Sequence, residues 1–272
     1  MGALVLIRGG GEIGSAVAMR LVRIGVYVLV TEIPQPRAMR RTTAFAEAVY
    51  ARETLVEDMG GKILHDASDT PRLVAILTKQ QVPVLVDGAC ACVPGLHPTV
   101  IVDTRMPERP PTRLRYVPRM YIGIGPGFEV GVNCEAAIGA RAGFDLGHVY
   151  WKGGPPPEAR RATHHLSLLR APQHGQMVAH VCIGDKVTAG QVVAEVRDEQ
   201  GACQTVCAVT DGVVWGLLHD GIWIESGAVI AEIAPPEYQD ICHRLSEDAL
   251  AIAGGVLEAM LSKEAVRRLV WA

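Results

Sequence analysis

The N-terminal part of the chain alternates short apolar runs with a segment of helical periodicity. Ala3–Arg8 is a continuous apolar run that ends in a glycine-rich turn, and Ser15–Ile24 then places its apolar residues on one helical face. Gly25 follows at the position of a C-cap, and Val26–Thr31 is a second apolar run. This order of strand, turn, helix and strand predicts a βαβ unit.

Later apolar runs predict further strands of the same sheet. Val82–Asp87 and Thr99–Asp103 are apolar without alternation, which is typical of parallel strands covered on both faces, and Tyr121–Ile124 is expected to be another strand. Helices are expected over Arg40–Tyr50 and over Thr70–Gln80, the second because Pro71 stands in its first turn. Residues 62–65 suit either a strand or a short turn.

An internal repeat follows a Gly-Pro-rich stretch at Gly153–Pro157, which predicts a linker. Gly184, Gly190 and the triplet Ala-Glu-Val at 194–196 recur 37 residues later as Gly221, Gly227 and Ala-Glu-Ile at 231–233. Each half predicts two short strands around a glycine turn. Two such halves related by a pseudo-two-fold axis predict a flattened β-sandwich of the biotinyl/lipoyl kind over residues 174–235.

The expected fold class is therefore α/β: a Rossmann-like parallel sheet, then a lipoyl/biotinyl-like β-sandwich (barrel-sandwich hybrid) module, then a terminal helix. The expected boundaries are 1–152 for the nucleotide-binding domain, 153–165 for the linker, 166–236 for the β module and 237–272 for the C-terminal helical segment. Ser246 is expected to cap the last helix. Gly254 and Gly255 within that helix predict a closely packed backbone.

Composition and charge narrow the class of protein. The chain has 272 residues, 49% hydrophobic residues and a net charge of −3, which suits a folded globular protein and predicts no nucleic-acid partner. No apolar run reaches the length of a membrane span, and the first residues do not form a secretory signal, so we expect no membrane association. An odd number of cysteines, seven, predicts a reduced, cytoplasmic setting.

The glycine-rich turn is the strongest chemical signal. Gly9, Gly11 and Gly14 follow a predicted strand and open a predicted helix, and Glu32 stands at the end of the next strand. In this context the glycines allow a tight turn and the approach of pyrophosphate to the helix N-terminus, while the carboxylate meets a ribose. The predicted cofactor-binding residues around the turn also include Gly10, Glu12 and Ile13.

The identity of the ligand stays open between NAD(P), FAD and a molybdopterin dinucleotide. Glu32 favours free ribose hydroxyls, whereas Arg40 and Arg41 could contact a phosphate or simply form a solvated helix start. A second glycine-rich loop contains Gly125 and Gly127, which predict either an anion-binding nest or a structural turn at the sheet edge.

Other candidate groups carry weaker signals. Five arginines between residues 105 and 119, interleaved with prolines, predict an extended cationic loop. Cys92 lies where α/β sheets bind ligands, but the cysteine spacing does not match a metal or redox motif, and the adjacent pair His164 and His165 is not expected to bind a metal. The connection Arg197–Asp211 contains no lysine, so we expect no covalent biotin or lipoate. No catalytic residue is assigned.

Several stretches together resemble a known family. They are IRGGGEIG at 7–14, TEIPQPRAMRRTTAFAEAVY at 31–50, IGIGPGF at 122–128, DGVVWGLLHDG at 211–221 and AIAGGVLEAML at 251–261. They look like the accessory proteins of the selenium-dependent molybdenum hydroxylase maturation system, which are encoded alongside xanthine dehydrogenase-type enzymes. The resemblance implies a cytosolic role in the synthesis, modification or insertion of a modified molybdenum cofactor. It also implies a molybdenum hydroxylase or its maturation factors as partners.

The leading functional hypothesis is thus a nucleotide-binding accessory protein for molybdenum hydroxylase maturation. An NAD(P)-dependent oxidoreductase and a non-catalytic interaction scaffold are the alternatives. Whether the chain is an enzyme, and whether it forms a homo-oligomer, stays open at this point.

Overall fold

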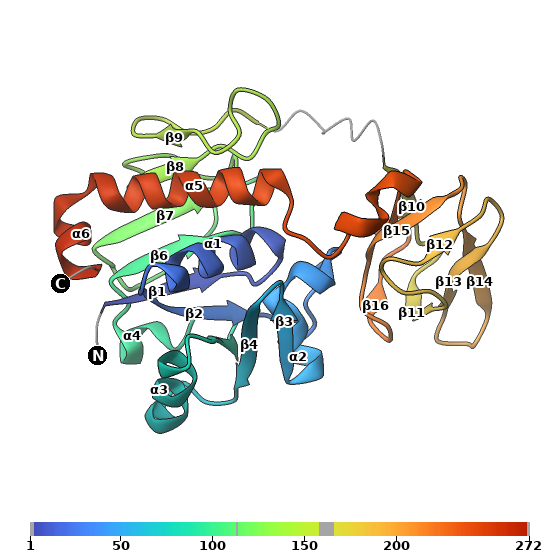
Figure 1. The fold of residues 1–272 in the computed structure, drawn as a ribbon, viewed down its shortest axis with the longest axis horizontal. Helices are drawn as coiled ribbons and strands as arrows, with labels where there is room; N and C mark the ends of the chain where they lie inside the picture. The colour runs from blue at the N-terminus through green and yellow to red at the C-terminus, as the bar shows by residue number, and fades with distance from the viewer. Residues whose placement is uncertain (1–2, 113, 158–165, 271–272) are drawn as a thin grey trace. The chain divides into compact units, whose positions relative to one another are not determined.

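The computed structural model describes residues 3–112, 114–157 and 166–270, and these residues divide into two compact units (Figure 1). The first unit contains the described residues of 1–36, 44–161 and 245–272, and the second those of 37–43 and 162–244. The C-terminal segment expected at 237–272 is thus not a separate part, because residues from 245 onward belong to the first unit. Residues 158–165 of the expected linker, with His164 and His165, lie outside the described residues.

The first unit is built on one large sheet, with nine strands within the described residues in the order β3-β4-β5-β2-β1-β6-β7-β8-β9. The strands are β1 (Leu4–Arg8), β2 (Tyr27–Glu32), β3 (Glu53–Val56), β4 (Met59–Leu64), β5 (Val82–Val86), β6 (Val100–Asp103), β7 (Met120–Ile124), β8 (Ala136–Ile138) and β9 (Val149–Tyr150).

The sheet is mixed, which corrects the expectation of a parallel sheet. Its centre from β4 to β8 is parallel, but β3 pairs with β4 and β9 pairs with β8 in antiparallel fashion. The three strands that the sequence pattern missed are β3, β8 and β9. They are two to four residues long, so they do not form the apolar runs that identify the central strands.

Helices cover both faces of this sheet. On one face α1 (Glu12–Arg23) and α5 (Glu247–Ser262) lie side by side and bury Val5 and Ile7 of β1 (Figure 1). On the other face α3 (Thr70–Thr78) and α4 (Val93–Leu96) bury Leu6 of β1. Because successive side chains of a strand point to opposite faces, continuous apolar runs are required here. The chain also contains α2 (Ala48–Ala51) and α6 (Glu264–Val270).

The helix expected over Arg40–Tyr50 is replaced by short turns. The structure has 3-10 turns at Arg41–Thr43 and Phe45–Glu47, followed by the single turn of α2. The amides of this segment have other acceptors: Phe45 N donates to Ser15 Oγ at 2.8 Å, and Ala46 N donates to Gly10 O at 2.8 Å. These tertiary bonds compete with the i to i−4 bonds that a helix requires.

The second unit contains two antiparallel four-stranded sheets among its described residues, ordered β10-β17-β15-β12 and β14-β13-β11-β16. The strands are β10 (Ser167–Arg170), β11 (Gly175–Ala179), β12 (Lys186–Val187), β13 (Val192–Arg197), β14 (Cys203–Cys207), β15 (Gly212–Leu217), β16 (Trp223–Ile224) and β17 (Val229–Ala234), with a 3-10 turn at Pro236–Ile241. The two halves of the repeat match strand for strand, β12 and β13 against β16 and β17. Each sheet contains strands of both halves.

Two local expectations are confirmed in the C-terminal helix. Ser246 Oγ accepts a hydrogen bond from Ala249 N, so Ser246 caps α5. A Cβ atom on Gly255 would overlap the carbonyl oxygen of Gly147, so glycine is needed where the two backbones meet. The expectation of close packing is wrong for Gly254, where a Cβ atom would have no atom within 4 Å.

The glycine turn before α1 generates a stability prediction. A Cβ atom on Gly14 would overlap the carbonyl oxygen of Gly9, whereas one on Gly11 would have no atom within 4 Å. We expect Gly14→Ala to destabilise the first unit by about 2 kcal/mol or more. Gly11→Ala, the matched control, should cost ~1 kcal/mol or less.

The measurement is urea unfolding followed by circular dichroism, with hydrogen exchange of the β1 and β2 amides to assign the affected unit. Equal stability of the two variants would contradict the observed packing of the turn.

Candidate functional site

The turn between β1 and α1 is crowded everywhere except at one glycine. Gly9 has φ +99° and donates its N–H to Thr31 O at 2.9 Å, which fastens the turn to β2. A Cβ atom on Gly10 would lie 2.9 Å from Val30 Cγ1 and 3.0 Å from Ala46 N. Gly11, the N-cap of α1, faces open space instead. The helix N-terminus is therefore accessible at Gly11.

Glu32 lies beside this opening at the end of β2. Its carboxylate accepts hydrogen bonds from Gly10 N at 2.6 Å and from Ile33 N at 2.9 Å. Burial raises the pKa of Glu32 above its ordinary value of 4.5, and the two backbone hydrogen bonds offset only part of that effect. The structure thus brings Glu32 to the glycine turn, as the sequence predicts.

Glu12 and Ile13 have mainly structural contacts. Glu12 Oε1 accepts a hydrogen bond from Ser246 N at 2.8 Å and so joins the first turn of α1 to the start of α5. The Ile13 side chain packs partly buried against the apolar core. These two residues can therefore contribute to an anion site mainly through the backbone at the start of α1.

A buried ionic cluster lies next to the glycine turn, and its centre is Asp103 at the end of β6. The Asp103 side chain is fully buried; Arg105 Nε donates to its Oδ1 at 2.8 Å and Arg105 Nη2 to its Oδ2 at 2.7 Å. Oδ2 also accepts from Arg8 Nη1 at 3.1 Å and from the Tyr121 hydroxyl at 2.9 Å. One carboxylate thus connects β1, β6, β7 and the loop after β6.

The protonation states of Arg8, Arg105 and Tyr121 are stabilised by their neighbours in this cluster. The hydrogen bond to Asp103 raises the pKa of Arg105. Burial alone would lower the pKa of Arg8, but attraction to Asp103, Tyr121 and Cys90 together outweighs burial, and the net shift of the pKa is upward. Burial, aided by Asp103, raises the pKa of Tyr121, so its hydroxyl stays neutral at physiological pH. Two guanidinium groups face one carboxylate, which gives the cluster a formal charge of +1.

The cluster was not among the site residues predicted from the sequence. The sequence pattern places Arg105 only in an arginine-rich loop, and Arg8 and Asp103 only at the ends of apolar strands. The available signal was an ionisable residue at the end of each of two apolar runs, where parallel strands place polar groups at one edge of the sheet.

Gly125 and Gly127 form a structural turn and not an anion-binding nest. Gly125 N donates to Ile138 O at 3.0 Å and Gly127 N to Pro107 O at 2.9 Å, so both amides are bound to protein carbonyls. A Cβ atom on Gly127 would lie 2.7 Å from Arg109 O, so glycine is needed because the loop after β6 packs directly against this turn.

Arg40 and Arg41 lie in the second unit and bind its backbone. Arg40 Nη2 donates to Cys242 O at 3.2 Å and to Arg244 O at 2.7 Å, and its guanidinium stacks 4.0 Å from the centre of the Trp215 ring. Arg41 Nε donates to Leu217 O at 3.1 Å. Both guanidinium groups thus bind protein groups of the second unit.

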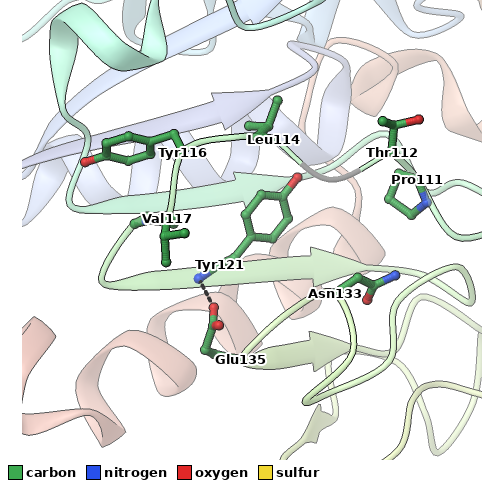
Figure 2. Close-up of a pocket in the computed structure, with 9 residues that line it drawn as sticks. Pro111, Thr112, Leu114, Tyr116, Val117, Tyr121, Asn133 and Glu135 are labelled. Atoms are coloured by element: carbon green, nitrogen blue, oxygen red, sulfur yellow. Dashed lines mark hydrogen bonds between the residues drawn. The ribbon is translucent and has the colours of Figure 1, made fainter.

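A small cavity lies on the sheet face that Tyr121 also occupies (Figure 2). It has a volume of about 200 Å³ and is lined by Pro111, Thr112, Leu114, Tyr116, Val117, Pro118, Tyr121, Asn133 and Glu135. Figure 2 shows Glu135 beneath Tyr121, where its carboxylate accepts from Tyr121 N at 2.6 Å. The cavity is smaller than most ligand sites, and Asn133 is already bonded to Glu129 N and Gly127 O.

Cys92, which lies between β5 and α4, is a neutral thiol. Burial and a hydrogen bond to Asp87 raise its pKa, which is unfavourable for a nucleophile or metal ligand. Among the described residues, no group of three or more His, Cys, Asp or Glu side chains is arranged to hold a metal ion. No described helix is long and apolar enough to cross a membrane.

Comparison with known proteins gives one curated relative. No family model matches the chain. The uncharacterized protein YqeB of Escherichia coli (strain K12) is 34% identical over 265 residues, a match that covers 95% of this chain and 47% of that protein. The chain therefore spans about half the length of this relative.

Solved structures match only weakly. An aspartoacylase family protein from Mesorhizobium loti covers 87% of this chain and 86% of its own, at 12% identity and a TM-score of 0.29. A succinylglutamate desuccinylase/aspartoacylase from Rhodobacter sphaeroides covers 86% and 85%, at 15% identity and a TM-score of 0.27. The urea carboxylase of Kluyveromyces lactis covers 25% of this chain and 6% of its own, at 28% identity and a TM-score of 0.24. Scores this low carry no argument about activity.

The fold class expected from the sequence is corrected by the sheet itself, which is mixed and not parallel throughout. The structures matched over most of the chain are described as aspartoacylase and desuccinylase proteins, none of them as a Rossmann-type protein with a lipoyl-like module. What the structure supports is the broader class, an α/β fold with a mixed sheet. None of these matches is described as a selenium-dependent, Rossmann-type dinucleotide-binding maturation protein, so the comparisons give that expected description no support.

The raised pKa of Glu32 generates a prediction about stability and pH. Ionising a group whose pKa is raised by folding costs stability, so the contribution of Glu32 is complete below pH 4.5 and decreases as the pH rises through its folded pKa. Glu32→Gln does not titrate and should become more stable relative to the wild type over that rise. Urea unfolding of both proteins between pH 4 and pH 8 measures the difference; a constant difference would show that Glu32 does not titrate abnormally.

Proposed function

We propose that this chain binds a phosphate-bearing small molecule, nucleotides among the candidates, at the edge of the large sheet where β1, β2 and β6 end. The observation that carries the proposal is the open position at Gly11, set between Gly10 and Gly14, which are both tightly packed. If the turn served packing alone, we would expect a neighbouring group to cover Gly11, where α1 begins.

The start of α1 supplies the attraction for an anion. The first N–H groups of an α-helix have no acceptor within the helix, and the helix dipole gives that end a partial positive charge. A phosphate oxygen that approaches Gly11 meets no side chain, because a Cβ atom there would already face open space. Backbone amides at such a position bind phosphate without a dedicated cation.

Glu32 would select a ligand with a hydroxyl group near its phosphate. The carboxylate is held beside the turn by Gly10 N and Ile33 N and keeps further acceptor capacity for a ligand hydroxyl. Its negative charge disfavours a second phosphate at that place. The proposal is one of binding: the edge orients a phosphate and an adjacent hydroxyl group, and no reaction is assigned to it.

The experiment is titration calorimetry of the purified protein with inorganic pyrophosphate, ADP, NAD, NADP and FAD. We expect saturable binding of at least one of these ligands. Gly11→Trp should weaken that binding by about 10-fold or more, because an indole would fill the opening that the phosphate needs.

Gly95→Trp is the matched control, since Gly95 is exposed, has no atom within 4 Å of a Cβ position and lies in α4 away from the turn. Failure of every ligand to bind the wild type, or equal binding by the Gly11 variant, would overturn the proposal.

A further inference from the structure

The loop after β6 runs directly across the glycine turn. Thr104 Oγ1 donates to Gly9 O at 2.8 Å and lies 3.0 Å from Arg8 O, so the loop is fastened to the backbone of the turn. A Cβ atom on Gly9 would lie 3.3 Å from Arg105 Cγ. The stem of Arg105 therefore lies over the first glycine of the turn.

This loop is unusual for a connection between parallel strands. Such connections normally contain a helix, but between β6 and β7 the described residues 104–112 and 114–119 form neither helix nor strand. Loops of this length without regular structure inside a compact unit are uncommon and often functional. Here the loop brings Arg105 to the edge where the proposed ligand binds.

The two arginines that share Asp103 are placed differently. Arg8 is only 5% exposed, and its Nε is among the described buried side-chain nitrogens without a hydrogen-bond partner. The Arg105 side chain is 39% exposed. The buried guanidinium of Arg8 thus neutralises the Asp103 carboxylate. The second positive charge of the cluster, on Arg105, is exposed to solvent.

Arg105 also keeps donors for a ligand while it is bound to Asp103. Of the five N–H donors of a guanidinium, it directs Nε–H and one hydrogen of Nη2 to the carboxylate. Both hydrogens of Nη1 and the second hydrogen of Nη2 point away from that bidentate pair. The fork is therefore held in one orientation before a ligand arrives, which lowers the entropy lost on binding.

We infer that Arg105 is the residue that recognises the negative charge of the ligand at the Gly9–Gly14 turn, with Asp103 as the positioning residue that aims its guanidinium. This inference rests on the proposed function. It assigns to the site a side-chain cation in addition to the backbone amides of α1. It also predicts a preference for ligands with two or more negative charges, such as a pyrophosphate group, over neutral analogues.

A purely structural role for Arg105 makes a different prediction. If the guanidinium only fastened the loop to Asp103, its replacement would lower stability and leave ligand charge recognition unchanged. The two roles are separated by the salt dependence of binding, because loss of an ion pair to the ligand flattens that dependence whereas loss of a loop contact does not.

The test is calorimetric titration of inorganic pyrophosphate, at several salt concentrations, into the wild type, Arg105→Gln, Arg105→Lys and Arg109→Gln. We expect Arg105→Gln to weaken binding by about 10-fold to 100-fold and to flatten the salt dependence. Arg105→Lys should give a smaller loss, because it keeps the charge and loses the fork. Arg109→Gln removes an equal charge from an exposed position of the same loop and should change affinity less than about twofold.

The outcomes separate the two proposals. If neither pyrophosphate nor any of the nucleotides titrated above binds the wild type, the proposed phosphate site is overturned and this inference with it. If a nucleotide binds and pyrophosphate does not, only the role of Arg105 is overturned. If the wild type binds and Arg105→Gln binds equally well with the same salt dependence, only the role of Arg105 is overturned. Should Arg105→Gln not fold by circular dichroism, the comparison of Arg105→Lys with Arg109→Gln decides, since equal affinities would overturn the assignment.

Discussion

The edge of the large sheet depends on one fully buried carboxylate. Asp103 accepts hydrogen bonds from Arg8, Arg105 and Tyr121, and so connects the ends of β1 and β6 with β7 and the loop between them. A buried carboxylate without such partners would be strongly unfavourable, and removal of one partner from a buried ion pair typically costs about 3–5 kcal/mol. The start of the loop after β6 is thereby held at this edge, because Arg105 is bound to Asp103.

The loop after β6 contacts the two glycine-rich segments in different ways. Where the loop meets the turn before β8, it binds the amide of Gly127 and leaves that turn a structural element. Where it crosses the turn before α1, it contacts Gly9 and leaves Gly11 uncovered. Two segments with similar glycine patterns therefore have different surroundings, because the loop binds the amide of Gly127 and leaves Gly11 uncovered.

The second unit shows how proximity in the sequence can mislead. Arg40 and Arg41 follow Glu32 closely along the chain, yet residues 37–43 belong to the second unit and their guanidinium groups bind its carbonyl oxygens. The helix expected over Arg40–Tyr50 does not form, because residues 40–43 belong to the second unit and residues 44–50 to the first. In the first unit, Phe45 and Ala46 bond to Ser15 and Gly10, so the segment closes over the turn that it follows.

The sequence by itself determined the features that depend on local geometry. The central strands, α1, α3 and the cap of α5 were predicted, because apolar runs, 3.6-residue periodicity and capping residues act within a few residues. The turn at Gly9–Gly14, its neighbour Glu32 and the 37-residue repeat were predicted for the same reason. Only the tertiary structure decided the antiparallel edges of the sheet, the role of Gly125 and Gly127 and the placement of Arg40 and Arg41. It also revealed that Asp103 lies between Arg8 and Arg105. Arg8 and Asp103 are 95 positions apart in the chain, and no local pattern specifies which strand ends become neighbours.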